Sequence, residues 1–323
     1  MELIVGRPQK KAGSFLFANI DRIKIMKKLL LVFAAAMVFA GAVFAQTKPG
    51  FSIEGHRGAR GWVPENTIPS FIKALELGAD TIELDLAVSA DGKLVVSHDP
   101  YFVADISLDP KGQPIDPAKQ KEHNIHKMKY AEIRKYDVGS LGNKGFPDQI
   151  KMKVHKPLLS DVFRAVDEYL RKKGGKRTVR YNIEIKSDPQ GDGIFFPQPA
   201  VFAKKVLDEI LKYKKQNSVI VQSFDVRPLQ ELNKANVKLP LALLVGNPLG
   251  VEKNIEKLGF VPNTYSPHFG LVDAATVEAC HKMGMKIVPW TVNETTDIEK
   301  MKKFDLDGII TDYPDRVVKI YGN

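Results

Sequence analysis

From residue 51 onward the chain alternates short apolar runs with longer amphipathic stretches. Short apolar runs bounded by polar turns predict strands, whereas apolar residues at helical spacing predict helices. Strands are expected at 51–53, 81–88, 94–96, 179–186, 218–224, 241–245, 264–266, 286–290 and 307–311. Helices are expected between the later strands, at 199–214, 227–235, 251–258, 274–283 and 297–304. This rhythm predicts β/α repetition around a parallel sheet.

Two segments interrupt the repeating pattern. Residues 89–92, Ser-Ala-Asp-Gly, predict a tight turn rather than a helical crossover, so one strand near them is expected to be irregular. Residues 101–156 hold a stretch rich in Lys, Asp, Pro and His without a clear period, which predicts a loop or small insertion. Because it follows a strand end, we expect it to cap a cleft and to influence which substrate enters.

Two of the predicted strands carry acidic residues on one face. Glu83 and Asp85 lie two apart and therefore point the same way. Glu184, in the strand at 179–186, shares a face with Asn182 and Lys186 and can complete a site of three carboxylates. Buried carboxylates repel one another unless a cation or proton lies between them, and oxygen ligands without cysteine favour Mg²⁺ or Ca²⁺ over zinc. The alternative is that these residues form the polar faces of half-exposed strands.

Two histidines follow short apolar runs. His56 and His98 are each expected at the carboxyl end of a strand, where active sites assemble in parallel α/β proteins. One imidazole can take a proton from a nucleophile while the other protonates a leaving oxygen. Arg57 offers a planar fork for a phosphate, although a surface salt bridge is the alternative. The remaining histidines are expected to be structural: His123, His126, His155, His268 and His281.

Several motifs occur together in a fixed order. They are Gly-His-Arg-Gly at 55–58, Pro-Glu-Asn-Thr at 64–67, Glu-Leu-Asp at 83–85, His-Asp at 98–99 and Glu-Ile-Lys at 184–186. Further segments at 131–139, 157–162, 222–225 and 290–293 follow in the same order. This set resembles the glycerophosphodiester phosphodiesterase family. The resemblance implies an α/β fold, a TIM (β/α)8 barrel with a small insertion after the third strand. Nine strands are predicted for the eight positions of such a barrel.

The resemblance also implies the chemistry. It implies metal-dependent hydrolysis of glycerophosphodiesters to sn-glycerol 3-phosphate and an alcohol, with one divalent cation, Ca²⁺ or Mg²⁺. The substrate's own glycerol hydroxyl would attack phosphorus, since a tethered hydroxyl has a high effective molarity, and water would then open the cyclic phosphate. The implied roles are His56 as general base, His98 as general acid, Glu83, Asp85 and Glu184 as metal ligands, Arg57 and Lys186 as phosphate-binding residues, and Trp290 at the substrate mouth.

The sequence departs from the family pattern at Glu54, where a small or apolar residue is more usual. This extra carboxylate is expected either near the site or pointing outward. Other functions remain alternatives: a related barrel phosphodiesterase acting on a phospholipid or phosphoinositide, or a catalytically silent binding protein. The intact histidines and carboxylates disfavour the silent protein, and a nucleic-acid partner is not expected because no recognised binding motif is present.

The first 45 residues form a separate segment. Met26 and two lysines precede a 17-residue apolar stretch at 29–45, which resembles a secretory signal peptide cut before Gln46. We therefore expect translation to start at Met26, export to the periplasm or medium, and a barrel domain at 46–323 without a stable membrane anchor. An uncleaved anchor is the alternative, since the stretch is at the short limit for spanning a membrane.

The charge of the whole chain overstates that of the predicted domain. The chain has 48 basic and 38 acidic residues, of which seven and two lie in residues 1–45, so 41 and 36 remain. A modest basic surface can attract an anionic, small-molecule substrate. Cys280 is the only cysteine, so no internal disulfide is possible. The oligomeric state is not indicated by the sequence.

Overall fold

The computed structural model describes residues 50–175, 177–235 and 237–322. The predicted signal peptide, its cleavage point and the start at Met26 lie outside these residues. The described residues belong to one compact unit. In the part of the chain that the structure describes, no helix has both the length and the apolar character needed to cross a membrane.

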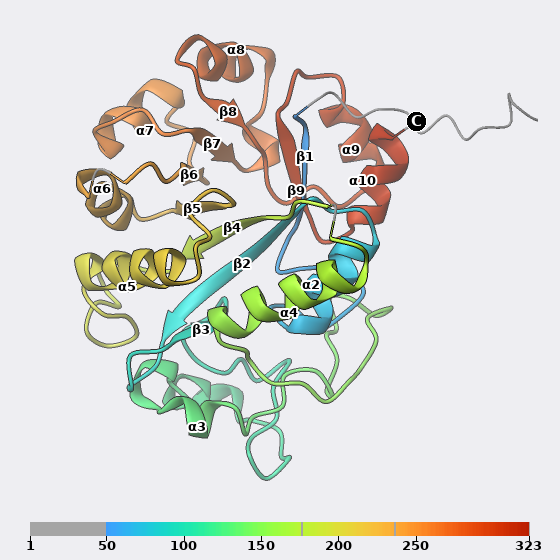
Figure 1. Ribbon diagram of the computed structural model, residues 1–323, viewed down its shortest axis with the longest axis vertical. Coiled ribbons are helices and arrows are strands. Elements are labelled where there is room, and N and C mark those ends of the chain that lie inside the picture. The colour runs from blue at the N-terminus through green and yellow to red at the C-terminus, as the bar shows by residue number, and fades with distance from the viewer. Residues whose placement is uncertain (1–49, 176, 236, 323) are drawn as a thin grey trace, which may run out of the picture. The chain divides into compact units, whose positions relative to one another are not determined.

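Eight parallel strands form a barrel (Figure 1). They are β1 (Ser52–Gly55), β2 (Thr81–Val88), β4 (Arg180–Ile185), β5 (Val219–Ser223), β6 (Leu241–Val245), β7 (Thr264–Pro267), β8 (Lys286–Ile287) and β9 (Gly308–Thr311). The strands pair in the order β8-β7-β6-β5-β4-β2-β1-β9. Backbone hydrogen bonds of 3.0 Å from Asp307 to Ile287 and 2.9 Å from Ile310 to Pro289 link the two ends. The predicted (β/α)8 barrel is confirmed.

The ninth predicted strand lies outside the barrel. β3 (Leu94–Val96) pairs antiparallel with β2, with Leu86 opposite Val96. The turn between them needs Gly92 at a φ of +74°, a conformation that glycine adopts without steric cost. The irregular strand expected near this turn is therefore β3, which returns alongside β2 instead of continuing the barrel.

Helices surround the barrel (Figure 1). They are α2 (Ile68–Glu76), α4 (Leu159–Lys172), α5 (Pro199–Lys212), α6 (Val226–Lys234), α7 (Val251–Leu258), α8 (Ala274–Lys282), α9 (Thr295–Met301) and α10 (Pro314–Tyr321). The helices α5 to α9 match the predicted ones. The helices α2, α4 and α10 were not predicted, although Thr67 caps α2 through its hydroxyl and α2 and α10 carry proline in their first turn.

Alternation along β2 separates the core from the site. Leu84 and Leu86 are fully buried and join Phe71 of α2 and Phe163 of α4 in the main hydrophobic core. Glu83 and Asp85, which alternate with these leucines along the strand, point to its opposite side, because successive side chains in a strand alternate. The apolar residues thus fix the strand against the outer helices and leave the acidic residues facing the barrel interior.

The predicted insertion is a folded segment. Between β3 and α4 it contains η1 (Pro117–Glu122), η2 (Ile125–Lys127) and α3 (Tyr130–Ile133), and it lies beyond β3 in Figure 1. It has a second hydrophobic core in which the rings of Phe102 and Tyr136 stack 3.8 Å apart. A core of its own explains why no period was visible: buried residues are spread over short turns rather than one long element.

Candidate active site

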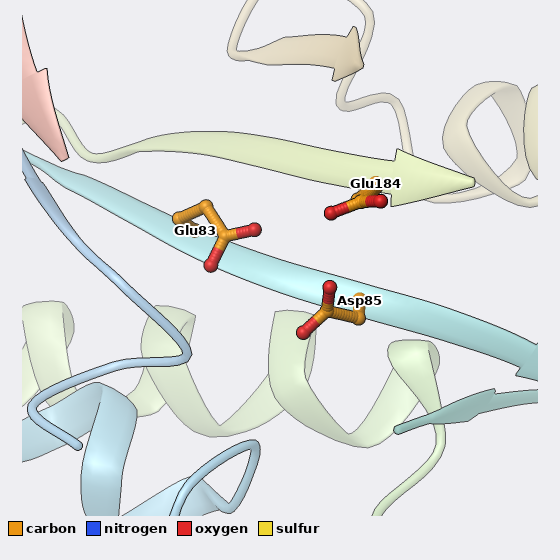
Figure 2. Close-up of side chains that lie close together, drawn as sticks. All are labelled: Glu83, Asp85 and Glu184. Atoms are coloured by element: carbon orange, nitrogen blue, oxygen red, sulfur yellow. The ribbon is translucent and has the colours of Figure 1, made fainter. Parts of the chain in front are cut away.

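Three carboxylates converge inside the barrel, as Figure 2 shows. Glu83 and Asp85 come from β2, and Glu184 comes from the neighbouring β4, where it lies directly opposite Asp85 in the strand register. One oxygen from each side chain lies within 4.8 Å of the others, and all three side chains are buried. The alternative that these are half-exposed polar faces is therefore wrong.

Hydrogen bonds orient these carboxylates. Glu83 accepts from the backbone N–H of Arg57 (2.8 Å) and from Nε2 of Gln222 (3.0 Å). Asp85 accepts from Nδ2 of Asn66 (2.8 Å) through Oδ2, whereas its buried Oδ1 accepts no hydrogen bond from the described residues and lies 3.9 Å from Nζ of Lys186. A buried acceptor without a donor is costly. The unsatisfied oxygen and two neighbouring carboxylates suit a divalent cation with oxygen ligands.

The three acids differ in their tendency to ionise. Burial raises the pKa of Glu83 well above its usual value, with Asp85 and Glu184 adding to the effect, and burial raises the pKa of Glu184 to about 7. Burial also acts to raise the pKa of Asp85, but the charges of His98, Arg57 and Lys186 hold it far below its usual value. Asp85 is thus an anion, whereas burial favours the protonated form of its two partners unless a cation lies between them.

His56 follows β1 and is held by Asp312. Its Nδ1 lies 2.7 Å from Oδ1 of Asp312, whose other oxygen accepts from Nδ2 of Asn293 (2.7 Å). Burial opposes ionisation of Asp312, but its interactions with His56, Arg60 and Asn293 lower its pKa to about 2, so the carboxylate accepts from Nδ1–H. Burial lowers the pKa of His56, and Asp312 works against this. The neutral imidazole therefore keeps a lone pair on Nε2, as a base requires.

His98 reaches the site by an unexpected route. His98 follows the carboxyl end of β3, as predicted, but β3 is antiparallel to its neighbour β2 and is not one of the parallel strands of the barrel. β2 extends past the carboxylates and β3 runs back, so that Ser97 N donates to the carbonyl of Asp85 (2.9 Å). His98 then contacts Asp99 through Nδ1 (3.1 Å) and Nζ of Lys186 through Nε2 (3.0 Å).

Two cations lie beside the carboxylates. Arg57 donates to Glu65 (2.8 Å) and lies 3.6 Å from Asp85, and its side chain is only 12% exposed, so it is not a surface salt bridge. Lys186 lies 3.0 Å from Glu184. Fixed cations near a partly protonated acid cluster form a site that is ready to receive an anion such as a phosphate.

The site opens into a cavity of about 210 Å³ with an aromatic wall. Trp290 is fixed by a hydrogen bond from Nε1 to the carbonyl of Ser266 (2.9 Å), and the ring of Phe224 meets it edge-on at 5.2 Å. The cavity is lined by seven of the eight predicted site residues, His56, Arg57, Glu83, His98, Glu184, Lys186 and Trp290, and Asp85 lies beneath them in the carboxylate cluster.

Sequence reasoning assigned no role to several residues of this site, among them Gln222 and Asn66, which hold Glu83 and Asp85. Asp312 holds His56, Asn293 holds Asp312, Arg60 lies 3.2 Å from Asp312 and lines the cavity, and Phe224 completes the aromatic wall. Phe224 and Asn293 stand inside motifs that had been noticed without a role. Asp312 directly follows a predicted strand, which is the signal that could have found it.

An acid cluster suited to a cation, paired histidines and fixed cations at the carboxyl edge of a barrel define a hydrolase of phosphate esters. The model of the glycerophosphoryl diester phosphodiesterase family matches residues 56–316. The chain belongs to this family, and it is accordingly a phosphoric diester hydrolase, an enzyme.

Two relatives carry the same activity in their names. The glycerophosphodiester phosphodiesterase of Caldanaerobacter subterraneus is 34% identical over 266 residues, which cover 82% of this chain and 95% of the relative. That of Bacillus subtilis is 30% identical over 273 residues, covering 82% and 84%. The resemblance drawn from the motifs is confirmed.

Solved structures share the fold. A Silicibacter pomeroyi protein provisionally assigned as a glycerophosphoryl diester phosphodiesterase superposes with a TM-score of 0.74 at 31% identity, covering 84% of this chain and 92% of that one. A phosphodiesterase of Oleispira antarctica, in complex with the product sn-glycerol-3-phosphate, superposes with a TM-score of 0.65 at 20% identity and covers 83% and 95%.

Proposed function

We propose that this enzyme hydrolyses glycerophosphodiesters to sn-glycerol 3-phosphate and an alcohol with the help of one divalent cation. The observation that carries the proposal is the position of the three carboxylates between two histidines and two fixed cations in one small cavity. Such a cavity offers a proton acceptor, a proton donor and positive charge around a single phosphate.

Glu83, Asp85 and Glu184 would hold the cation. Their convergence supports this assignment, as does Oδ1 of Asp85, which accepts no hydrogen bond from the described residues, and oxygen ligands suit Ca²⁺ or Mg²⁺. When bound, the cation would neutralise charge on the phosphate and keep all three acids ionised. Arg57 and Lys186 would bind the remaining phosphate oxygens, and Lys186 would leave Nε2 of His98 to do so.

The two histidines would divide the proton transfers. His56, kept in one tautomer by Asp312, takes the proton of the attacking hydroxyl on Nε2. The bond from phosphorus to the leaving alcohol breaks as His98 delivers a proton to that oxygen. If the attacking hydroxyl belongs to the glycerol itself, a cyclic phosphate forms, and water opens it with the two roles reversed.

The cavity favours a small substrate. Its volume of about 210 Å³ lies below the roughly 300–1,000 Å³ of pockets for drug-sized ligands. The related Oleispira antarctica enzyme holds sn-glycerol-3-phosphate. Trp290 and Phe224 present apolar surface that would pack against the carbon chain of a glycerol. A glycerophosphodiester with a small polar head group fits these dimensions better than an intact phospholipid.

The test is release of sn-glycerol 3-phosphate from glycerophosphocholine by the purified protein. We expect no release in EDTA and recovery when Mg²⁺ or Ca²⁺ is added in excess, with the more effective ion naming the cofactor. Release that is unchanged by EDTA would contradict the cation's role. Failure with glycerophosphocholine, glycerophosphoethanolamine and glycerophosphoglycerol alike would contradict the substrate class.

Export to the periplasm or medium is a further part of the proposal. It is supported by the lysines before the apolar stretch at 29–45 and by the small residues that precede Gln46. Amino-terminal sequencing of protein from the periplasmic fraction should begin at Gln46. A protein that stays in the cytoplasmic fraction with residues 29–45 attached would contradict this.

A further inference from the structure

A buried carboxyl below the site has no part in the proposed reaction. Glu54 lies on β1 and is only 2% exposed, so the alternative that it points outward is wrong. Its Oε2 accepts from Nδ2 of Asn182 on β4 (2.7 Å), although β2 separates these two strands in the sheet. The side chain therefore crosses the barrel interior.

Two amides connect this carboxyl to the acid cluster. Nδ2 of Asn182 donates its second hydrogen to Oε1 of Gln222 on β5 (3.0 Å), and Nε2 of Gln222 donates to Oε1 of Glu83 (3.0 Å). The chain Glu54–Asn182–Gln222–Glu83 thus begins and ends on a carboxylate. All four side chains are buried, so water does not compete for these bonds.

The direction of the hydrogen bonds depends on Glu54. Because Glu54 accepts, Asn182 points its nitrogen at both neighbours and leaves its own buried Oδ1 without a partner. Gln222 must then turn its oxygen toward Asn182 and its nitrogen toward Glu83. Without an acceptor at position 54, Asn182 can rotate to satisfy Oδ1, and the donor that faces Glu83 is no longer fixed.

Burying this acid is not needed to fill the barrel. Desolvation raises the pKa of Glu54 to about 7, Asp80 raises it further, and Asn182, Ser52 and Arg180 oppose the rise. An apolar side chain of similar length would avoid that desolvation, but it would leave Nδ2 of Asn182 and Oγ of Ser52 without this acceptor. The carboxyl is thus better explained by what it orients than by what it stabilises.

We propose that Glu54 is a positioning residue that sets the Glu83 carboxylate for cation binding through Asn182 and Gln222. The inference rests on the proposed role of Glu83 as a metal ligand. Groups that orient metal ligands through hydrogen bonds typically change metal affinity by about 10- to 100-fold when they are removed. Glu54 would act through two intervening amides: it holds Asn182, which orients Gln222, and Gln222 contacts Glu83.

The test measures affinity for Mg²⁺ and Ca²⁺ alone by isothermal titration calorimetry, with thermal unfolding beside it. Glu54→Met removes the acceptor and is expected to weaken cation binding by about 10-fold or more, while its unfolding transition shows whether the variant is folded. Glu54→Gln keeps an acceptor for Asn182 and should restore affinity close to the wild-type value. Asn182→Leu removes the next group in the same series of hydrogen bonds. If Glu54→Met does not fold, Asn182→Leu must show the same loss of cation affinity.

Thr81→Val is the matched control. Thr81 is buried beside Glu54 and bonds to Ser52 (2.9 Å) and Asp80 (2.7 Å), but it is not part of the path to Glu83. Its cation affinity should equal that of the wild type. A folded Glu54→Met protein with wild-type affinity would overturn the positioning role and leave the proposed function standing. Wild-type protein that binds neither cation would overturn both.

Discussion

Single side chains at this site act through their partners. His56 is defined as a base by Asp312, and Asp85 is kept ionised by the surrounding cations, as the lowered pKa of each carboxyl indicates. The residue types that the motifs supply are necessary for the chemistry. Their protonation states, however, follow from neighbours that come from other strands.

Removing either histidine should abolish turnover without unfolding the protein. His56→Ala and His98→Ala each remove one proton-transfer group, which typically contributes about 10²- to 10⁴-fold to the rate. His155→Ala is the control, because this side chain is exposed, and it should retain full activity. The measurement is kcat with folding checked by circular dichroism, and normal turnover by a folded His98→Ala protein would contradict its role.

Asp312→Asn should change the pH profile as well as the rate. The carboxylate raises the pKa of His56, so its removal lowers that pKa and moves the acidic limb of kcat/KM to lower pH. The plateau should fall too, since an amide no longer enforces the tautomer with hydrogen on Nδ1. A profile that falls in height but keeps its acidic limb in place would show that Asp312 affects only structure.

At the scale of elements, the β2–β3 hairpin decides where His98 lies. A helical crossover after β2 would carry the chain to the outside of the barrel, whereas the turn at Gly92 returns it along β2. Hydrogen bonding between Ser97 and Asp85 then fixes the register. The tight turn at Gly92 therefore brings His98 into the site, although His98 does not follow a strand of the barrel.

Gly92→Ala should reduce both stability and activity. A side chain at a φ of +74° costs about 1–2 kcal/mol, and relief of that strain disturbs the hairpin that carries His98. Gly112→Ala is the matched control, since Gly112 has a φ of +79° in the insertion with open space around it. Urea unfolding should show a similar loss for both variants, while only Gly92→Ala lowers kcat. Equal activities would contradict the role of the hairpin.

For the whole molecule, the interior polar groups should make stability depend on pH and cation. Burial raises the pKa values of Glu54, Glu83 and Glu184, so the folded state binds more protons than the unfolded chain between about pH 4.5 and 7. Stability of the cation-free protein should therefore fall as the pH rises through this range. His56, whose pKa is lowered, acts in the opposite direction, but it is one group against three.

Thermal unfolding at pH 5 and pH 7.5, with EDTA or with Ca²⁺ or Mg²⁺, checks this expectation. A cation needs ionised ligands, so its stabilising effect should be larger at pH 7.5, amounting to about 2.7 kcal/mol at 100 times its Kd. The pH dependence should shrink when the cation is present. Equal stabilisation at both pH values would contradict the assignment of the raised pKa values to the ligand cluster.

The sequence alone determined the strands, the barrel and the residue types of the site. Alternation of polar and apolar residues placed Glu83 and Asp85 on one face, and the order of the motifs identified the family. Both can be read from the linear sequence without knowing which distant residues meet in space. Tertiary structure decided the antiparallel course of β3, the Asp312 partner of His56 and the inward direction of Glu54. These depend on residues distant in sequence, such as Glu54 and Asn182, which only closure of the barrel brings together.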